Sequence, residues 1–203
     1  MKPSAPGEKR GHGSCDTTFD CVFHVFFRSR PSMTASARGE GAGGADSRGV
    51  PLEDPQKILT LLNSLAQTSR DGEAGFRTCA ADSSDPALKA YFEECATRCD
   101  RAASMLAEEV MRRGGSPEVG GSVTGAVHRA FVNIKAVVAT RNDLAVLDEC
   151  ERGEDFALRA YSRALDVDLP ADLRILIEAQ YMGVKHNHDR IKALRDERRR
   201  LSA

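Results

Sequence analysis

A Gly-Glu pair occurs twice inside long helical patterns, at Gly72-Glu73 and at Gly153-Glu154, and an aromatic residue follows each pair closely. Glycine in a helix interior costs roughly 1 kcal/mol relative to alanine. Its repetition therefore indicates that two helices approach closely around a buried or half-buried carboxylate, and that a methyl group added at either glycine would overpack the contact. We interpret the chain as two copies of a helical hairpin, each with one such glutamate on its first helix.

The apolar residues of the C-terminal three quarters recur at three- and four-residue steps, as they do in amphipathic helices. Capping residues, prolines and glycines divide this pattern, and they predict helices at about 55–81, 86–113, 123–140, 143–165 and 171–200. Short turns make the first two helices one antiparallel pair and the last two another. The middle helix then joins the halves, so we expect an all-α, ferritin-like four-helix bundle of two helical hairpins joined by a helical crossover, formed by residues 54–200.

The first 53 residues show no sustained periodicity and are rich in Gly, Ser, Ala, Pro and Arg. Such a composition is typical of a disordered N-terminal extension. The apolar run Cys21–Phe27 is short and follows Asp16 and Asp20, so it does not fit a secretory signal. An alternative is that translation begins at Met33.

Composition and charge exclude several classes of partner. The net charge of −1 gives no support for nucleic-acid binding, and no apolar run approaches the roughly 20 residues of a membrane span. The six cysteines lack the spacing of a metal finger, and Cys95 and Cys99 lie four residues apart on one helix, where a disulfide fits poorly. We therefore expect reduced thiols and a cytoplasmic protein.

Several separated segments resemble, in the same order, a bacterial family of small ferritin-like four-helix-bundle proteins that is a domain of unknown function. These segments are Asp71–Arg77, Gly125–Arg129, Glu149–Asp155 and His188–Arg190. The resemblance covers about residues 59–196 and leaves the N-terminal extension out. It implies the bundle fold and implies no established activity.

Ferritin-like di-iron proteins use one Glu from each of two helices and a Glu-x-x-His from each of the other two. Here the candidate metal ligands are Glu73, Glu94, Glu154 and Glu178. Three residues after Glu94 and Glu178, however, stand Thr97 and Tyr181 in place of histidine. The incomplete set favours a bundle without a cofactor, and iron at a degenerate carboxylate site is the alternative.

His188 is the one histidine that the pattern places on a core stripe, roughly level with Cys150 and Glu151. A Cys-His-Glu group is able to bind zinc. A core histidine that shares a hydrogen bond with a carboxylate is the more common arrangement, and we expect that arrangement here.

No nucleophile motif, phosphate-binding loop or dinucleotide fingerprint occurs in the chain. The sequence thus favours a structural or interaction protein, or a stress-associated one, without catalysis, which acts as a homo-oligomer or with another protein. Two alternatives stay open: a metal-binding oxidase or storage protein with a degenerate di-iron site, and a thiol-based redox sensor.

Overall fold

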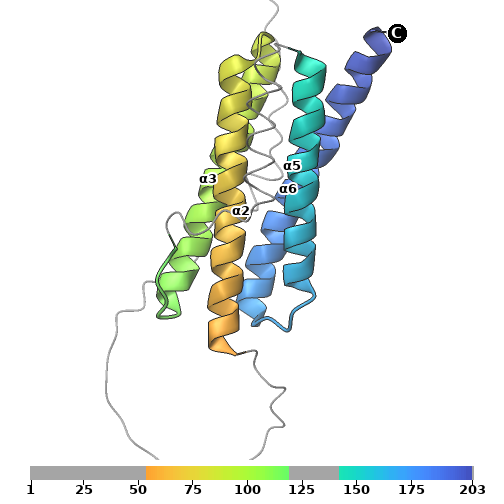
Figure 1. Cartoon of the computed structure of the whole chain (residues 1–203). Coiled ribbons are helices and arrows are strands. Elements are labelled where there is room, and N and C mark those ends of the chain that lie inside the picture. The colour runs from red at the N-terminus through yellow and green to blue at the C-terminus, as the bar shows by residue number, and fades with distance from the viewer. Residues whose placement is uncertain (1–53, 119–141, 203) are drawn as a thin grey trace, which may run out of the picture. The chain divides into compact units, whose positions relative to one another are not determined.

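A computed structural model describes residues 54–118 and 142–202. These residues form four α-helices (Figure 1): α2 (Pro55–Asp82), α3 (Pro86–Arg112), α5 (Asp143–Leu165) and α6 (Ala171–Leu201). All four helices belong to one compact unit. The four predicted helices at these positions are confirmed. The predicted crossover helix at 123–140, the predicted disorder of residues 1–53 and the alternative start at Met33 lie outside the described residues.

The helix ends follow the capping residues that the sequence supplies. The side chain of Asp54 accepts a hydrogen bond from the amide of Gln56 at 3.0 Å, and Asp85 accepts one from Ala87 at 2.8 Å. Proline follows each of these aspartates, at a position where a helix loses no hydrogen bond. Gly114, with φ of +78°, ends α3 in the left-handed conformation that glycine adopts without strain.

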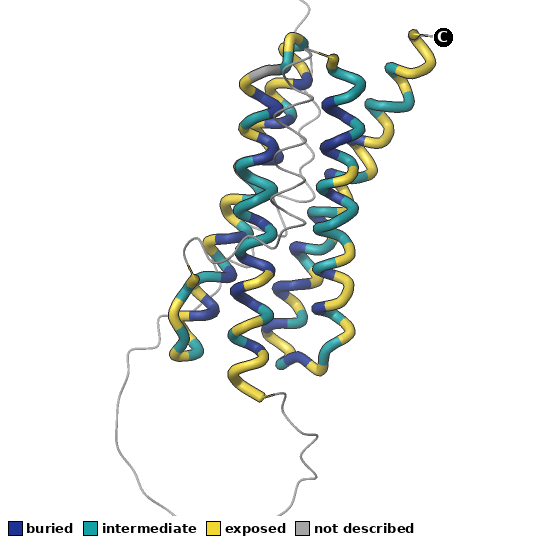
Figure 2. The backbone as a smooth tube through the Cα atoms, viewed as in Figure 1, coloured by how far each residue is buried: buried dark blue, intermediate teal, exposed yellow. Residues whose placement is uncertain are grey.

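The helices pack as two hairpins, α2 with α3 and α5 with α6. Among the described helices, the hairpins meet mainly where α2 packs on α5, and α3 packs less extensively on α6. The buried residues lie on the sides of the helices that face one another (Figure 2). This arrangement confirms the expected all-α four-helix bundle of two hairpins.

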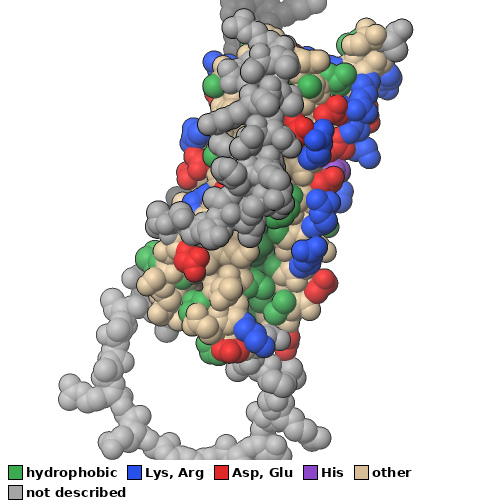
Figure 3. Space-filling model, in the orientation of Figure 1, with side chains coloured by type: hydrophobic (Ala, Val, Ile, Leu, Met, Phe, Trp, Pro, Cys, Tyr) green, Lys and Arg blue, Asp and Glu red, His purple; other side chains and the backbone are tan. Residues whose placement is uncertain are grey.

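Ion pairs at one end of the bundle join three helix termini. Arg198, in the last turn of α6, contacts both Asp85 at the start of α3 and Asp143 at the start of α5. One turn earlier Arg195 contacts Glu151. Lys and Arg side chains gather along this part of α6 (Figure 3). The pairs place positive charge at the C-terminus of α6 and negative charge at the N-termini of α3 and α5, which is the favourable arrangement for the helix dipoles.

The two glycines of the repeated Gly-Glu pair have different surroundings. A Cβ atom added at Gly72 would lie 3.2 Å from the Sγ of Cys99 on α3, whereas one added at Gly153 would meet nothing within 4 Å. The expectation of a close helix approach therefore agrees with the structure at Gly72. At Gly153 it is wrong, because no other described residue lies within 4 Å of the added Cβ atom.

We expect Gly153→Ala to stabilise the protein by roughly 0.5–1 kcal/mol, because alanine restricts the unfolded chain and fits the open space. The free energy of unfolding of Gly72→Ala should be lower than that of Gly153→Ala by about 1–2 kcal/mol, because the added methyl group presses on the Cys99 thiol. Urea unfolding of both variants measures the difference. The double variant Gly72→Ala/Cys99→Ala should recover most of this difference, because the thiol that the methyl group presses on is gone. If the effects of the two substitutions simply add, the contact with Cys99 is not the cause of the lower stability.

Candidate functional site

The core consists of two apolar clusters with buried polar side chains between them. One cluster is centred on Phe92 and Leu147, near the turn between α2 and α3, and the other on Leu62 and Ile177, near the turn between α5 and α6. The polar side chains between them come from all four helices. We call them the central polar layer: Ser69, Arg98, Glu154, Tyr161, Gln180 and Asn187. Ferritin-like bundles hold their metal sites in the bundle core, so this layer is the place to look for function.

A chain of hydrogen bonds crosses one side of the layer. The Tyr161 hydroxyl donates to Oε1 of Gln180 at 2.9 Å and accepts from the Ser69 hydroxyl at 2.9 Å. The Gln180 amide in turn donates to the backbone carbonyl of Ala102 at 3.3 Å. These four residues lie on α2, α5, α6 and α3, so one continuous chain joins all four helices.

Glu154 lies on the other side of the layer and is 5% exposed. Burial raises the pKa of its carboxyl to about 8, although a hydrogen bond with Asn187 and the positive charge of Arg98 act in the opposite direction. Its Oε2 atom is buried and accepts no hydrogen bond from the described residues. Near neutral pH the carboxyl is therefore mostly protonated and neutral, as a carboxyl in an apolar site should be.

Arg98 brings a guanidinium group from the edge of the bundle into the layer. Its Nη2 atom donates to Oδ1 of Asn187 at 3.0 Å and lies 3.2 Å from the Sγ of Cys95. The guanidinium also lies 5.9 Å from the centre of the Tyr91 ring, within the range of a cation–π contact. The layer thus contains one fixed positive charge next to one carboxyl group.

The structure does not gather the four predicted glutamate ligands at one point. Glu73 is half-buried and pairs with Arg77 on its own helix at 2.7 Å. Glu94 is 71% exposed at its side chain, and Glu178 is also exposed, so both lie on the outer surface. Glu154 alone lies in the core. The described residues contain no group of three or more His, Cys, Asp and Glu side chains that is able to hold a metal ion.

These residues do not fit a di-iron carboxylate centre. Such a centre needs several carboxylates around two cations, whereas here a single carboxyl faces a permanently positive guanidinium. A divalent cation in this layer would be repelled by Arg98.

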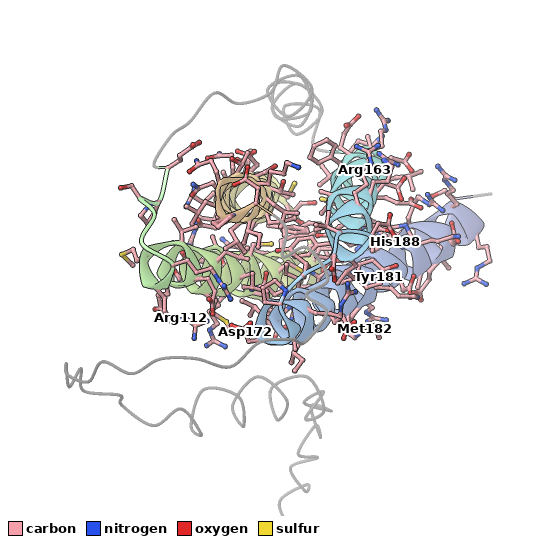
Figure 4. The ribbon with its side chains drawn as sticks, turned by 90° about the horizontal axis from the view of Figure 1, so that it is seen from below. Arg112, Arg163, Asp172, Tyr181, Met182 and His188 are labelled. Atoms are coloured by element: carbon pink, nitrogen blue, oxygen red, sulfur yellow. The ribbon has the colours of Figure 1, made fainter. Side chains whose placement is uncertain are left out.

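His188 lies on the side of α6 that faces α5 (Figure 4). Its Nε2 atom is 3.2 Å from Asp155 and its Nδ1 atom is 3.2 Å from Asp189. The contact of His188 with a carboxylate is as expected. The zinc alternative required Cys150 and Glu151 beside this histidine, but in the structure Cys150 contacts Cys79 and Glu151 contacts Arg195.

The pattern of apolar residues missed Gln180 and Asn187. They lie seven residues apart on the buried face of α6, between Ile177 and Ile191. The predicted core stripe includes His188 instead, which the structure places beside that face and half-buried. Gln180 and Asn187 follow Leu173 at seven-residue steps, and this spacing is the sequence feature that indicates their burial. A core face that is assigned from apolar residues alone does not include them.

The three described thiols outside the α2 helix are poor nucleophiles. Burial raises the pKa of Cys95 to about 12 and raises that of Cys99 well above its usual range. The pKa of Cys150 is also raised, mainly by its contact with Cys79 and to a smaller extent by burial. A thiol sensor that works through an exposed, ionised cysteine is therefore not supported by these residues.

Among the described helices, none combines the length and hydropathy that a membrane span requires. No curated protein matches the sequence. Residues 57–167 match the model of a family described as a domain of unknown function (DUF2383), which is a ferritin-like family. The match covers more than half of the chain and includes α3, α5 and nearly all of α2, while α6 lies beyond it. The chain therefore belongs to the DUF2383 family of ferritin-like domains.

Proposed function

We propose that this protein is a structural or interaction bundle that acts through its outer helix faces, without a metal centre or catalysis of its own. The observation that carries the proposal is the Arg98 guanidinium in the central polar layer. The guanidinium donates a hydrogen bond to Oδ1 of Asn187, and its positive charge lies where a ferritin-like bundle would bind a cation. With the centre filled by its own side chains, the outer surface is the part left to bind a partner.

The outer face of α6 is the surface that best supports such binding. Ile175 and Met182 are 52% and 57% exposed, and they lie seven residues apart, which is two helical turns. Figure 4 shows Met182 on the side of α6 away from the other helices. The exposed charged residues Glu178 and Lys185 lie beside this pair, Glu178 between the two apolar residues along the helix and Lys185 one turn beyond Met182. An apolar centre with a charged rim is typical of a protein interface, and a second copy of the chain is the partner we propose.

The test is the molar mass of the protein in solution, measured by light scattering over a range of concentrations. We expect the parent to form a dimer and Met182→Lys to shift it toward the monomer, because the lysine would bury an unpaired charge in the contact. Met111→Lys is the matched control: Met111 is 55% exposed but lies on α3. A parent that is monomeric at all concentrations would contradict the dimer and leave a different protein as the partner.

Elemental analysis of protein purified without chelators tests the other half of the proposal. We expect substoichiometric iron and no iron-dependent oxygen consumption, because Arg98 opposes a cation in the layer and Thr97 and Tyr181 replace the usual histidines. Two iron atoms per chain, with oxygen consumption that is lost in Glu73→Ala, would overturn the proposal. That result would establish the metal-binding oxidase or storage protein.

A further inference from the structure

Two cysteines from different hairpins are in direct contact. The Sγ atoms of Cys79 on α2 and Cys150 on α5 lie 3.4 Å apart, and both are free thiols. Cys79 is 1% exposed and Cys150 is 4% exposed. They belong to the same apolar cluster as Phe92 and Leu147, and 71 positions separate them in the sequence. This is a contact between the two halves of the bundle.

We propose that Cys79 and Cys150 are a modification site: hydroperoxides convert the two thiols to a reversible disulfide that covalently joins the hairpins. A disulfide bond is about 2.05 Å long, so the sulfur atoms need to approach by little more than 1 Å. The inference goes beyond the proposed interaction role and does not depend on it.

The other described cysteines are less suited to pairing. Cys95 and Cys99 lie on α3, four residues apart on one helix, where Cβ atoms are about 5–6 Å apart and too distant for a disulfide. The Sγ of Cys95 accepts a hydrogen bond from Arg98, and that of Cys99 lies against Gly72. Cys79 and Cys150 have each other as the sulfur contact, which makes the choice of partner specific.

The reaction balances with a hydroperoxide as the oxidant. One thiol attacks the outer peroxide oxygen, the O–O bond breaks, and the sulfur becomes a sulfenic acid while its proton leaves with the alcohol, or with water when hydrogen peroxide reacts. The second thiol attacks the sulfenic sulfur, the S–S bond forms and water departs. Two electrons pass from the sulfur pair to the peroxide. Because burial and the Cys79 contact raise the pKa of Cys150, the reaction should be slow compared with that of an exposed thiol.

The disulfide should make the bundle harder to open. A cross-link between residues 71 positions apart removes much of the freedom of the unfolded chain. For a chain of this size we expect the midpoint of thermal unfolding to rise by on the order of 10 °C. Dithiothreitol should return the midpoint to that of the reduced protein.

The experiment treats the reduced, folded full chain with hydrogen peroxide, blocks remaining thiols, and analyses tryptic peptides without reduction. Each of the four described cysteines falls in its own peptide, with Cys79 in residues 78–89 and Cys150 in residues 142–152. We expect the mass of these two peptides joined, together with the higher unfolding midpoint. Cys79→Ala and Cys150→Ala should lose both effects, whereas the control Cys95→Ala should keep them.

Three results would overturn the inference. The folded protein could yield no cross-link while the peroxide oxidises the cysteines to sulfinic acid; the cross-link could join any other pair, including Cys15 or Cys21; or it could form only after denaturation. The comparison of oxidised and reduced parent protein needs no substitution, so it remains decisive even if a cysteine variant fails to fold.

Discussion

Replacing Glu154 with glutamine is expected to stabilise the bundle at pH 8 by roughly 4–5 kcal/mol and to leave its stability almost unchanged near pH 4.5. The expectation rests on burial, which raises the pKa of this carboxyl from its ordinary 4.5 to about 8. The variant side chain has nearly the same shape and no charge at any pH. It therefore avoids the cost of ionising a carboxyl in the core.

The direction of the pH dependence follows from proton binding. Between about pH 4.5 and pH 8 the folded protein keeps the Glu154 proton while the unfolded chain has released it. The folded state is then the one that binds more protons, so the free energy of unfolding falls by about 1.4 kcal/mol for each pH unit in this window. Above pH 8 both states are ionised and the contribution of Glu154 no longer changes.

The measurement is the free energy of unfolding in urea at a series of pH values from 4.5 to 9. The difference between Glu154→Gln and the parent should grow from near zero to its full size across the window. Glu178→Gln is the matched control, because Glu178 is an exposed glutamate on α6, and it should differ from the parent by less than about 0.5 kcal/mol throughout. Parallel curves for Glu154→Gln and the parent would show that the carboxyl is solvated in the folded protein.

Removing the Tyr161 hydroxyl is expected to destabilise the protein by roughly 1–3 kcal/mol. Tyr161→Phe keeps the ring in its place but takes away the donor to Gln180 and the acceptor for Ser69, and both of those side chains are buried. Polar groups left unpaired in the core bear the full cost of their lost hydration. The loss should be seen in urea unfolding at neutral pH.

Tyr181→Phe controls for the loss of a hydroxyl as such. Tyr181 packs half-buried against the same apolar cluster, and its hydroxyl has no hydrogen bond to another described residue. We expect a change of less than about 0.5 kcal/mol. If the two variants lose the same stability, the hydrogen-bonded chain through Tyr161 contributes nothing specific.

The helices could be predicted from the sequence because their limits are local. Asp54-Pro55, Asp85-Pro86 and Asn142-Asp143 mark helix starts through the hydrogen bonds of their own side chains. In these cases the determining contacts lie within a few residues of each other.

The central polar layer could be predicted only in part, because its members depend on the rotation of each helix about its axis. An error of one residue on α6 exchanges Gln180 for Tyr181 and Asn187 for His188, and an apolar period does not detect buried amides. The repeated Gly-Glu pair also suggested a symmetry that the packing lacks. A Cβ atom added at Gly72 would press on a thiol of α3, whereas one added at Gly153 would meet no other described residue within 4 Å, and nothing in the repeated sequence distinguishes the two positions.

The hydrogen-bonded chain through Ser69, Tyr161 and Gln180 also fixes how the helices are aligned along the bundle axis. Leucine and alanine surfaces tolerate a slide of one helix past another by two turns, about 10 Å, with little loss of apolar contact. Such a slide would separate Tyr161 from Gln180 and leave Gln180 without its donor and its acceptor. A misaligned bundle would thus carry several unpaired polar groups, and the correctly aligned one would be selected during folding by this layer rather than by the larger apolar surfaces around it.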